Sequence, residues 1–207
     1  MPNITLYRHP LSGHAHRAQL LLSLLGIQAE LVDVDLMTGE QKSAEFLKKN
    51  PLGQVPVLED GDATVSDSNA ILVYLARKYD PTRRWLPVDP ALNAQVQKYL
   101  SVAAGPVANG PASARLITLF GADLNAEKTA ATAHNFFTVL DAALKTKDWL
   151  VAGHATIADI ANYAYIAHAP EGNVSLENYP NIRNWLSRIE SLDGFVPMQK
   201  SAIGLAA

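Results

Sequence analysis

The chain has 207 residues, no cysteine and a formal net charge of -3, and 48% of its residues are hydrophobic. This length can supply two small hydrophobic cores, and the slightly acidic balance argues against a nucleic-acid partner. Because cysteine is absent, no thiol or disulfide of the chain itself can take part in chemistry.

No apolar run reaches the roughly 18 residues that a membrane-spanning helix needs. The N-terminal residues also lack the basic, apolar and small-residue pattern of a secretory signal. We therefore expect a cytoplasmic protein with no membrane partner.

Residues 1–80 predict alternating strands and helices, because alternating or β-branched runs are separated by apolar runs with helical spacing. We expect an α/β domain that opens with a βαβ unit and contains a hairpin across Asp60-Gly61-Asp62. The predicted strands are Ile4–Tyr7, Ala29–Val34, Val55–Glu59 and Ala63–Val65, and the predicted helices are Ala15–Leu25, Gln41–Lys48 and Ser68–Lys78.

Residues 81–89 predict a linker with several prolines, and residues 90–207 predict an all-helical second domain. Small residues and prolines around Gly105-Pro106 and Gly110-Pro111 predict an interruption of the helical pattern and a roomy pocket there. The predicted helices of this domain are Ala91–Val107, Pro111–Phe120, Asn125–Lys145, Ile157–His168 and Ile182–Ser191.

A proline between two valines opens the third predicted strand. Pro56 has no backbone N–H group, so it must lie at a strand start, an edge or a bend. If the Val55-Pro56 bond is cis, the backbone N–H and C=O of Val55 point out of the sheet. These groups could then pair with an extended peptide, as a strand added to an edge.

Asp67 and Ser68 stand at the start of a predicted helix. Free N–H groups and the helix dipole favour a carboxylate at this position, and Asp67 can accept an ammonium group. An ordinary helix N-cap requires the same residue types, so the pattern alone leaves both interpretations open.

In this order, the motifs of the chain resemble those of the cytosolic glutathione transferases, over nearly the whole chain. The motifs are Gln41 to Leu47, Asn50-Pro51 to Val57, Asp67 to Ile71, and Gly153 to Asp159. The resemblance implies a thioredoxin-like domain at residues 1–80, a helical domain at 90–207 and a homodimer. It also implies glutathione as co-substrate, a small hydrophobic electrophile as second substrate, and no permanently bound cofactor.

The chemistry implied by this resemblance is activation of the glutathione thiol, whose pKa of around 8.5 leaves it mostly protonated at neutral pH. A hydroxyl donor at the positive end of a helix favours the thiolate, and a shift of about two units is worth about 2.7 kcal/mol. By resemblance, Pro10-Leu11-Ser12 followed by Arg17 matches the serine-type branches, in which the serine contacts the sulfur. An alternative is that Ser12 only caps the helix. Tyr7 is the alternative hydroxyl donor, since other branches of the family use a tyrosine for the same purpose.

The resemblance also assigns the other glutathione contacts, although Lys42 alone would read as a solvated helix charge. These residues are Lys42 with Gln41 for the glycyl carboxylate, Gln54, Val55 and Pro56 for the cysteinyl backbone, and Asp67 and Ser68 for the γ-glutamyl end.

By the same resemblance, the second substrate is expected against the first loop and the first helices of the second domain, which places Leu11, His14 and Arg115 near it. His14 also fits a solvated loop residue, and Arg115 fits a surface or dimer contact. Although His9, His14 and His16 lie close in sequence, no further ligand has suitable spacing, so we expect no metal site.

Thr156 and Asp159 match a variant capping box before an apolar run, so we expect a structural pair whose loss costs about 1 to 2 kcal/mol.

Two alternative functions remain open. The chain could be a non-catalytic binding or interaction protein, although the intact set of Lys42, Gln54, Asp67 and Ser68 argues against this. It could also be a different glutathione-dependent enzyme, such as a peroxidase, an isomerase or a lyase.

Overall fold

The computed structural model describes residues 4–207, and their contacts divide the chain into two compact units. The first unit comprises the residues up to Arg83 together with Asp193–Gln199, and the second comprises Arg84–Leu192 together with Lys200–Ala207. The segment Asp193–Gln199 therefore joins a unit from which it is remote in sequence.

A four-stranded mixed sheet forms the centre of the first unit. It contains β1 (Ile4–Arg8), β2 (Glu30–Asp33), β3 (Val57–Asp60) and β4 (Ala63–Ser66) in the order β2-β1-β3-β4. β1 is parallel to β2 and antiparallel to β3, and β3 forms a hairpin with β4. The thioredoxin-like α/β architecture that the sequence predicts is confirmed.

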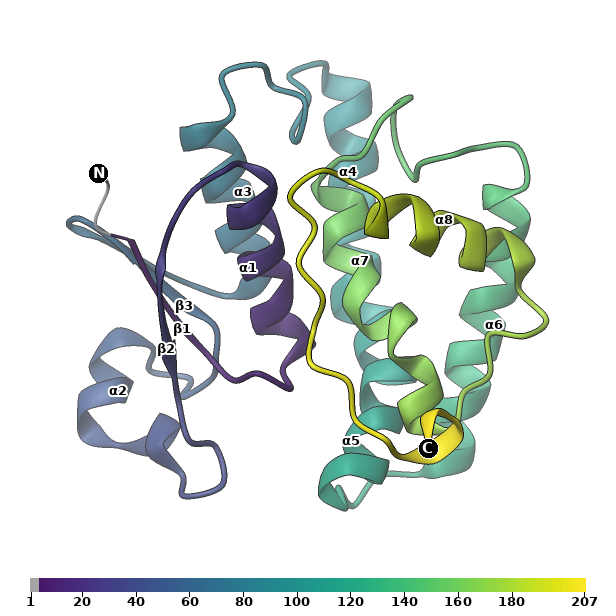
Figure 1. Cartoon of the computed structure of the whole chain (residues 1–207), viewed down its shortest axis with the longest axis horizontal. Coiled ribbons are helices and arrows are strands. Elements are labelled where there is room, and N and C mark those ends of the chain that lie inside the picture. Colours follow the sequence, from purple (N-terminus) through teal and green to yellow (C-terminus); the bar gives the residue numbers. More distant parts are fainter. Residues whose placement is uncertain (1–3) are drawn as a thin grey trace. The chain divides into compact units, whose positions relative to one another are not determined.

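Helices cover the two faces of this sheet differently (Figure 1). α1 (Gly13–Leu24) and α3 (Ser68–Tyr79) pack against each other on one face. α2 (Ala44–Lys49) lies on the other face, where Phe46 joins a small apolar cluster of strand and loop residues. This cluster contains Val34, Phe46 and Val57, with Tyr7, Leu36 and Val55 packed against it.

The single helix predicted from Gln41 to Lys48 is wrong in one respect, because it forms in two pieces. A short 3-10 helix, η1 (Glu40–Lys42), is followed by the extended residue Ser43, whose hydroxyl accepts from the Phe46 N–H at 3.2 Å. Ser43 is thus the N-cap of α2 and ends the preceding turn.

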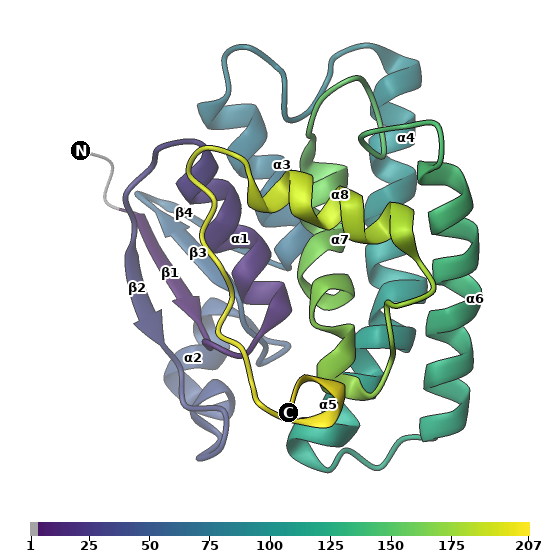
Figure 2. The same ribbon diagram turned by 45° about the vertical axis from the view of Figure 1, so that its right-hand side comes forward.

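The second unit is all helical, as predicted. α7 (Ile157–Ala167) runs through its middle, with α4 (Pro90–Val102), α6 (Ala126–Leu144) and α8 (Pro180–Glu190) around it (Figure 2), and nearly all α7 residues are buried. No helix within residues 4–207 is long and apolar enough to cross a membrane. The other elements of this unit are η2 (Ala103–Ala112), α5 (Ser113–Phe120), η3 (Ala169–Gly172) and η4 (Gly204–Ala206).

The predicted interruption between residues 103 and 112 is a change of helix type, not an end. η2 is a π-helix that joins α4 to α5. Pro106 and Pro111 are five residues apart, so in an i to i+5 pattern their missing N–H groups fall in one column of hydrogen bonds. Gly110 allows close packing on α6, because a Cβ atom there would lie 2.9 Å from the Ala133 nitrogen.

Candidate functional site

Ser12 is the N-cap of α1, at the end of the loop that follows β1. Its Oγ accepts a hydrogen bond from the Ala15 N–H at 3.2 Å, and its own N–H donates to the His9 carbonyl at 2.9 Å. A hydroxyl has one hydrogen to donate, and within the described residues that hydrogen has no acceptor. The half-buried hydroxyl can therefore cap the helix and still donate to an anion at the positive end of α1.

Tyr7 lies on the opposite face of the sheet, among the residues around α2. Its hydroxyl donates to Glu59 Oε2 at 2.9 Å, and its ring packs edge-on against Phe46. Lys49 Nζ lies 2.5 Å from Glu59 Oε1, and this hydrogen bond, helped by the one from Tyr7, lowers the pKa of the Glu59 carboxyl. The only donor hydrogen of Tyr7 is thus engaged by a carboxylate.

A buried polar network joins the first turns of α1 and α3. Arg17 Nη1 donates to Ser68 Oγ at 3.2 Å and to Asn69 Oδ1 at 2.9 Å, and Ser68 Oγ lies 3.3 Å from His14 Nδ1. Arg17 and Ser68 are 1% and 4% exposed. The network fixes the two helix N-termini that bear Ser12 and Asp67 relative to each other.

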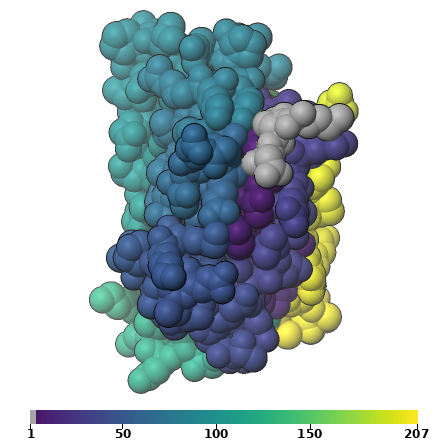
Figure 3. All heavy atoms as spheres, turned by 90° about the vertical axis from the view of Figure 1, so that its left-hand side faces the viewer, coloured from purple at the N-terminus to yellow at the C-terminus, as the bar shows by residue number. Residues whose placement is uncertain are grey.

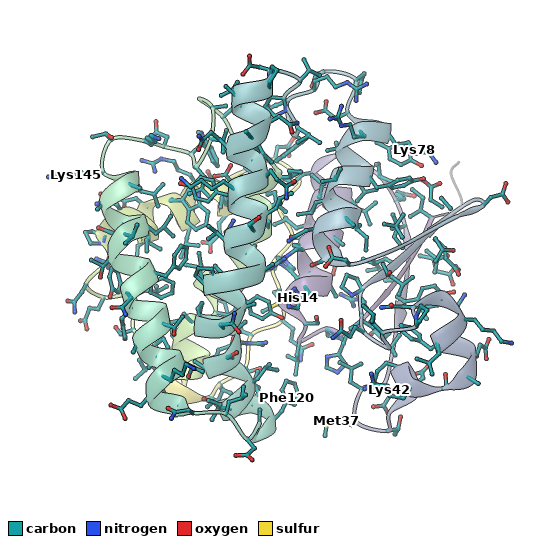
Figure 4. The ribbon with its side chains drawn as sticks, turned by 180° about the vertical axis from the view of Figure 1, so that it is seen from behind. His14, Met37, Lys42, Lys78, Phe120 and Lys145 are labelled. Atoms are coloured by element: carbon teal, nitrogen blue, oxygen red, sulfur yellow. The ribbon has the colours of Figure 1, made fainter. Side chains whose placement is uncertain are left out.

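His14 is the second residue of α1, so it is a half-buried helix residue and not the solvated loop residue that the sequence also allowed (Figure 4). Burial, with a further contribution from the positive charge of Arg17, lowers the pKa of His14 from 6.5 to about 3. The imidazole is therefore neutral at physiological pH, so it can accept the Ser68 hydroxyl hydrogen at Nδ1.

Asp67 has a positive φ of 72°, which is uncommon for a residue other than glycine. Its Oδ1 accepts from the Asn69 and Ala70 N–H groups, each at 2.9 Å, so it is the N-cap of α3. The N–H of Ser68 has no acceptor among residues 4–207. One free backbone donor and one exposed carboxylate thus stand side by side, as recognition of an amino-acid end group requires.

The turn before β3 is held by Asn50, which is 3% exposed. Asn50 Nδ2 donates to the Gln54 carbonyl at 2.8 Å, and Asn50 Oδ1 accepts from the Leu52 N–H at 3.1 Å.

The Val55-Pro56 bond is cis. Val55 precedes the first paired residue of β3, and no backbone hydrogen bond joins it to another described residue. Its N–H and C=O are therefore free to pair with an extended peptide.

Lys42 and Gln41 lie in η1, beside this turn. Lys42 is exposed, and its Nζ donates to the Leu52 carbonyl at 3.0 Å. Gly53 makes this approach possible, because a Cβ atom at that residue would lie 2.7 Å from Lys42 Nζ. Gln41 Oε1 is buried and has no hydrogen-bond partner among the described residues. Figure 3 shows this part of the surface, where α2 and its flanking segments appear in blue.

Arg115 does not have the exposed position that contact with an electrophile would require, and this part of the expectation is wrong. It is 2% exposed in the second unit, and its Nε donates to Glu171 Oε2 at 2.6 Å. Burial raises the pKa of Glu171, but hydrogen bonds from His168 and Arg115 outweigh that effect and leave the pKa below its usual value. Arg115 is thus part of a buried ion pair.

Thr156 and Asp159 form the capping box that the sequence indicates at the start of α7. Thr156 Oγ1 accepts from the Ala158 N–H at 3.2 Å, and Asp159 Oδ2 accepts from the Thr156 N–H at 2.9 Å. Asp159 Oδ1 also accepts from the Leu150 N–H and from Trp185 Nε1. Burial raises the pKa of Asp159, and these hydrogen bonds oppose that shift.

Three features of the site do not follow from sequence reasoning. These are the role of Asn50 in shaping the turn, the pairing of Arg17 with Asn69, and the hydrogen bond from His16 to Val196. Asn50 and Arg17 belong to the motifs that carry the resemblance, which signals that they matter for the site, but their partners depend on the fold.

Leu11 is a half-buried residue of the Ser12 loop, and its contact with an electrophile stays a prediction.

Comparisons with known proteins agree with this geometry. Residues 2–77 match the family described as "Glutathione S-transferase, N-terminal domain", and residues 121–193 match "Glutathione S-transferase, C-terminal domain". Glutathione S-transferase theta-1 of Homo sapiens is 30% identical over 201 residues, which cover 92% of this chain and 84% of the human protein.

Solved structures also resemble nearly the whole chain. The crystal structure of a glutathione S-transferase from Pseudomonas fluorescens Pf-5 has a TM-score of 0.88 and 34% identity, and covers 95% of this chain and 99% of that one. A glutathione transferase homologue from Drosophila mojavensis, solved with bound glutathione, has a TM-score of 0.81 and 31% identity, with 93% and 89% covered. With both domains matched in order, this chain belongs to the glutathione S-transferase family and is a glutathione transferase.

Proposed function

We propose that the Ser12 hydroxyl of this enzyme stabilises the thiolate of glutathione by a hydrogen bond, so that the thiol releases its proton to solvent. The thiolate then attacks small hydrophobic electrophiles, by substitution or addition. The observation that carries the proposal is the double use of Ser12 Oγ. It accepts from the Ala15 N–H at 3.2 Å while its own hydrogen is left for a further acceptor. A hydrogen bond to the charged form lowers the pKa of a thiol.

The positive end of α1 adds to this effect. The helix dipole favours a negative charge at Ser12, and the buried guanidinium of Arg17 supplies a full positive charge one turn further along. His14 adds no charge, because its pKa is lowered to about 3 by burial and by Arg17. Tyr7 is a poor alternative donor, since its hydrogen is engaged by Glu59.

Glutathione would be bound by the backbone and the charges that surround the Ser12 loop. We assign Lys42, with Gln41, to the glycyl carboxylate, and the exposed backbone of Val55, flanked by Gln54 and Pro56, to the cysteinyl residue. The homologue solved with bound glutathione supports a glutathione site in this fold. Glutathione is then a co-substrate, and no other cofactor is required.

At the γ-glutamyl end, the two sides of Ser68 have different tasks. Its hydroxyl is buried between Arg17 and His14, so it holds the helices together. Its free N–H is the group that can donate to the γ-glutamyl carboxylate, while the exposed carboxylate of Asp67 accepts the ammonium group. The positive φ of Asp67 turns its backbone at the point where the ligand would approach.

Leu11, in the Ser12 loop, and the neutral ring of His14 would offer the electrophile an apolar and weakly polar surface.

We further propose that the enzyme is a cytoplasmic homodimer, as the family resemblance implies. Light scattering of the purified protein tests the dimer, with a mass of one chain as the contradicting result.

A substrate panel tests the proposed reaction. Purified enzyme is assayed with glutathione and, in turn, aryl chlorides, enones, organic peroxides and aryl ethers. Conjugation of the aryl chloride or the enone is the expected result. Activity confined to peroxides, to isomerisation of cis-enones or to ether cleavage would replace the transferase reaction with one of the other glutathione-dependent reactions.

A further inference from the structure

Residues 193–199 lie along α1, although they follow the last long helix of the chain. Figure 1 and Figure 2 both show this yellow segment running beside the purple α1 helix. It belongs to the first unit by its contacts, and Met198 is 4% exposed within it. We call residues 193–199 the strap.

Two side chains of α1 donate hydrogen bonds to backbone carbonyls of the strap. His16 Nε2 lies 2.8 Å from the Val196 oxygen, and Ser23 Oγ donates to the Gly194 oxygen at 2.7 Å. His16 and Ser23 are seven residues apart, about two helical turns, so they lie on the same face of α1. Since a carbonyl only accepts, the proton of a neutral His16 ring must be on Nε2.

The strap runs from the end of α1 back to its beginning. Gly194, near Ser23, has a φ of 83°, and a Cβ atom there would lie 3.0 Å from the Ser23 carbonyl oxygen. Val196 is held at His16, which is one turn after Ser12. The path of the strap on the helix is therefore fixed at both ends. Gly194 packs closely against Ser23 at one end, and the His16 side chain, which is 3% exposed, holds Val196 at the other.

Beyond Val196 the strap reaches the loop that precedes Ser12. Pro197, Met198 and Gln199 line a cavity of about 270 Å³, together with His9 and Pro10 of that loop. The His9 carbonyl accepts the Ser12 N–H at 2.9 Å. The strap therefore borders both the loop and the helix between which Ser12 lies.

We propose that His16 is a positioning residue for Ser12, which acts by holding the first turn of α1 to the strap. The backbone N–H of His16 donates to the Ser12 carbonyl at 2.9 Å, so a backbone hydrogen bond joins the two residues directly. Without the bond to Val196, the first turn and its cap lose a fixed support, and the hydroxyl moves relative to the sulfur. This inference rests on the proposed role of Ser12.

Three variants of the 207-residue enzyme test the inference, with an aryl chloride as the electrophile. His16→Ala removes the donor. His16→Gln keeps an N–H at about the same reach, and Ser23→Ala removes the other strap bond at the far end of α1. We expect His16→Ala to lower kcat roughly 10-fold to 100-fold, with the KM for glutathione unchanged, and His16→Gln to recover most of kcat. Ser23→Ala should keep the kcat of the parent enzyme.

The ultraviolet absorbance of the thiolate in the glutathione complex gives a second measurement. It should fall in His16→Ala and return in His16→Gln. If His16→Ala does not fold, His16→Asn, whose shorter side chain cannot reach Val196, replaces it in the comparison with His16→Gln. Equal kcat and equal thiolate absorbance in these variants would overturn the inference.

The same measurement separates this inference from the proposed function. If Ser12→Gly leaves the thiolate absorbance intact, the role of Ser12 is wrong, and the inference fails with it. If Ser12→Gly abolishes the absorbance and His16→Ala keeps it, only the positioning role of His16 is overturned.

Discussion

The Ser12 hydroxyl accepts a hydrogen bond from the Ala15 N–H at 3.2 Å, so the residue expected to activate glutathione is also the N-cap of α1. Capping uses a lone pair of the oxygen, whereas stabilising a thiolate uses its hydrogen. The two roles are therefore compatible in one side chain, and they can be separated by substitutions that affect only one of them.

Ser12→Ala and Ser12→Gly should both lower kcat, because neither keeps a hydroxyl donor. Ser12→Ala should also lose about 1 kcal/mol of unfolding free energy, whereas a glycine N-cap costs only a few tenths of a kcal/mol. Kinetics and urea denaturation of both variants check this. The matched control is Tyr7→Phe, which removes a hydroxyl engaged by Glu59 and should stay active. An inactive Tyr7→Phe together with an active Ser12→Gly would exchange the two assignments.

Asp67→Asn should raise the KM for glutathione roughly 10-fold, since a bond to a charged group is worth about 1.5 to 3 kcal/mol. Asparagine caps helices as well as aspartate and tolerates the positive φ of this residue, so stability should be unchanged. Asp67→Ala should show the same rise in KM and, in addition, a loss of about 1 kcal/mol. A normal KM in Asp67→Asn would assign Asp67 to helix capping alone.

Asp159→Ala should lose more stability than a helix cap provides. Four buried donors would be left without an acceptor, namely the N–H and the hydroxyl of Thr156, the Leu150 N–H and the Trp185 indole N–H. Since an unsatisfied buried donor costs about 1 to 3 kcal/mol, we expect a loss of about 3 kcal/mol or more. Thr156→Ala, which removes the cap acceptor and one of the bonds to Asp159 but leaves the Asp159 carboxylate in place, should lose about 1 kcal/mol. Equal losses in urea denaturation would contradict this network.

His14 should stay neutral in the folded protein as the pH falls below 6.5, because burial and Arg17 lower its pKa to about 3. The unfolded chain binds that proton near pH 6.5, so the unfolded state binds more protons between these values. Stability is thus lost as the pH falls through this range. His14→Gln should lose less stability over the same range. An NMR titration of the folded protein that gives His14 the same pKa as in the urea-unfolded chain would refute the lowered pKa.

The first unit could be predicted well from sequence because its signals are local. Pro56 marks a strand start, Asp67 marks a helix N-terminus, and the residues around Ser12 follow one short motif. Each depends on neighbours within a few residues, where backbone geometry and capping dominate. Apart from the helix predicted from Gln41 to Lys48, which forms in two pieces, the predicted strands and helices of this unit agree with the structure to within a few residues.

The remainder could not be predicted because it depends on residues far apart in sequence. Arg115 and Glu171 are separated by 56 residues, and His16 and Val196 by 180. The π-helix needs the close contact between Gly110 and Ala133 in addition to its prolines. In each case tertiary packing overrides the local pattern, so an arginine that appears exposed in sequence is buried in the fold.

Calorimetric titration with glutathione near neutral pH, in two buffers with different ionisation heats, tests the central claim most directly. The difference between the two heats gives the number of protons released on binding. We predict saturable binding that releases close to one proton from the parent enzyme, and much less from Ser12→Gly. Saturable binding without proton release, or no binding at millimolar glutathione, would contradict activation of the thiol by this site.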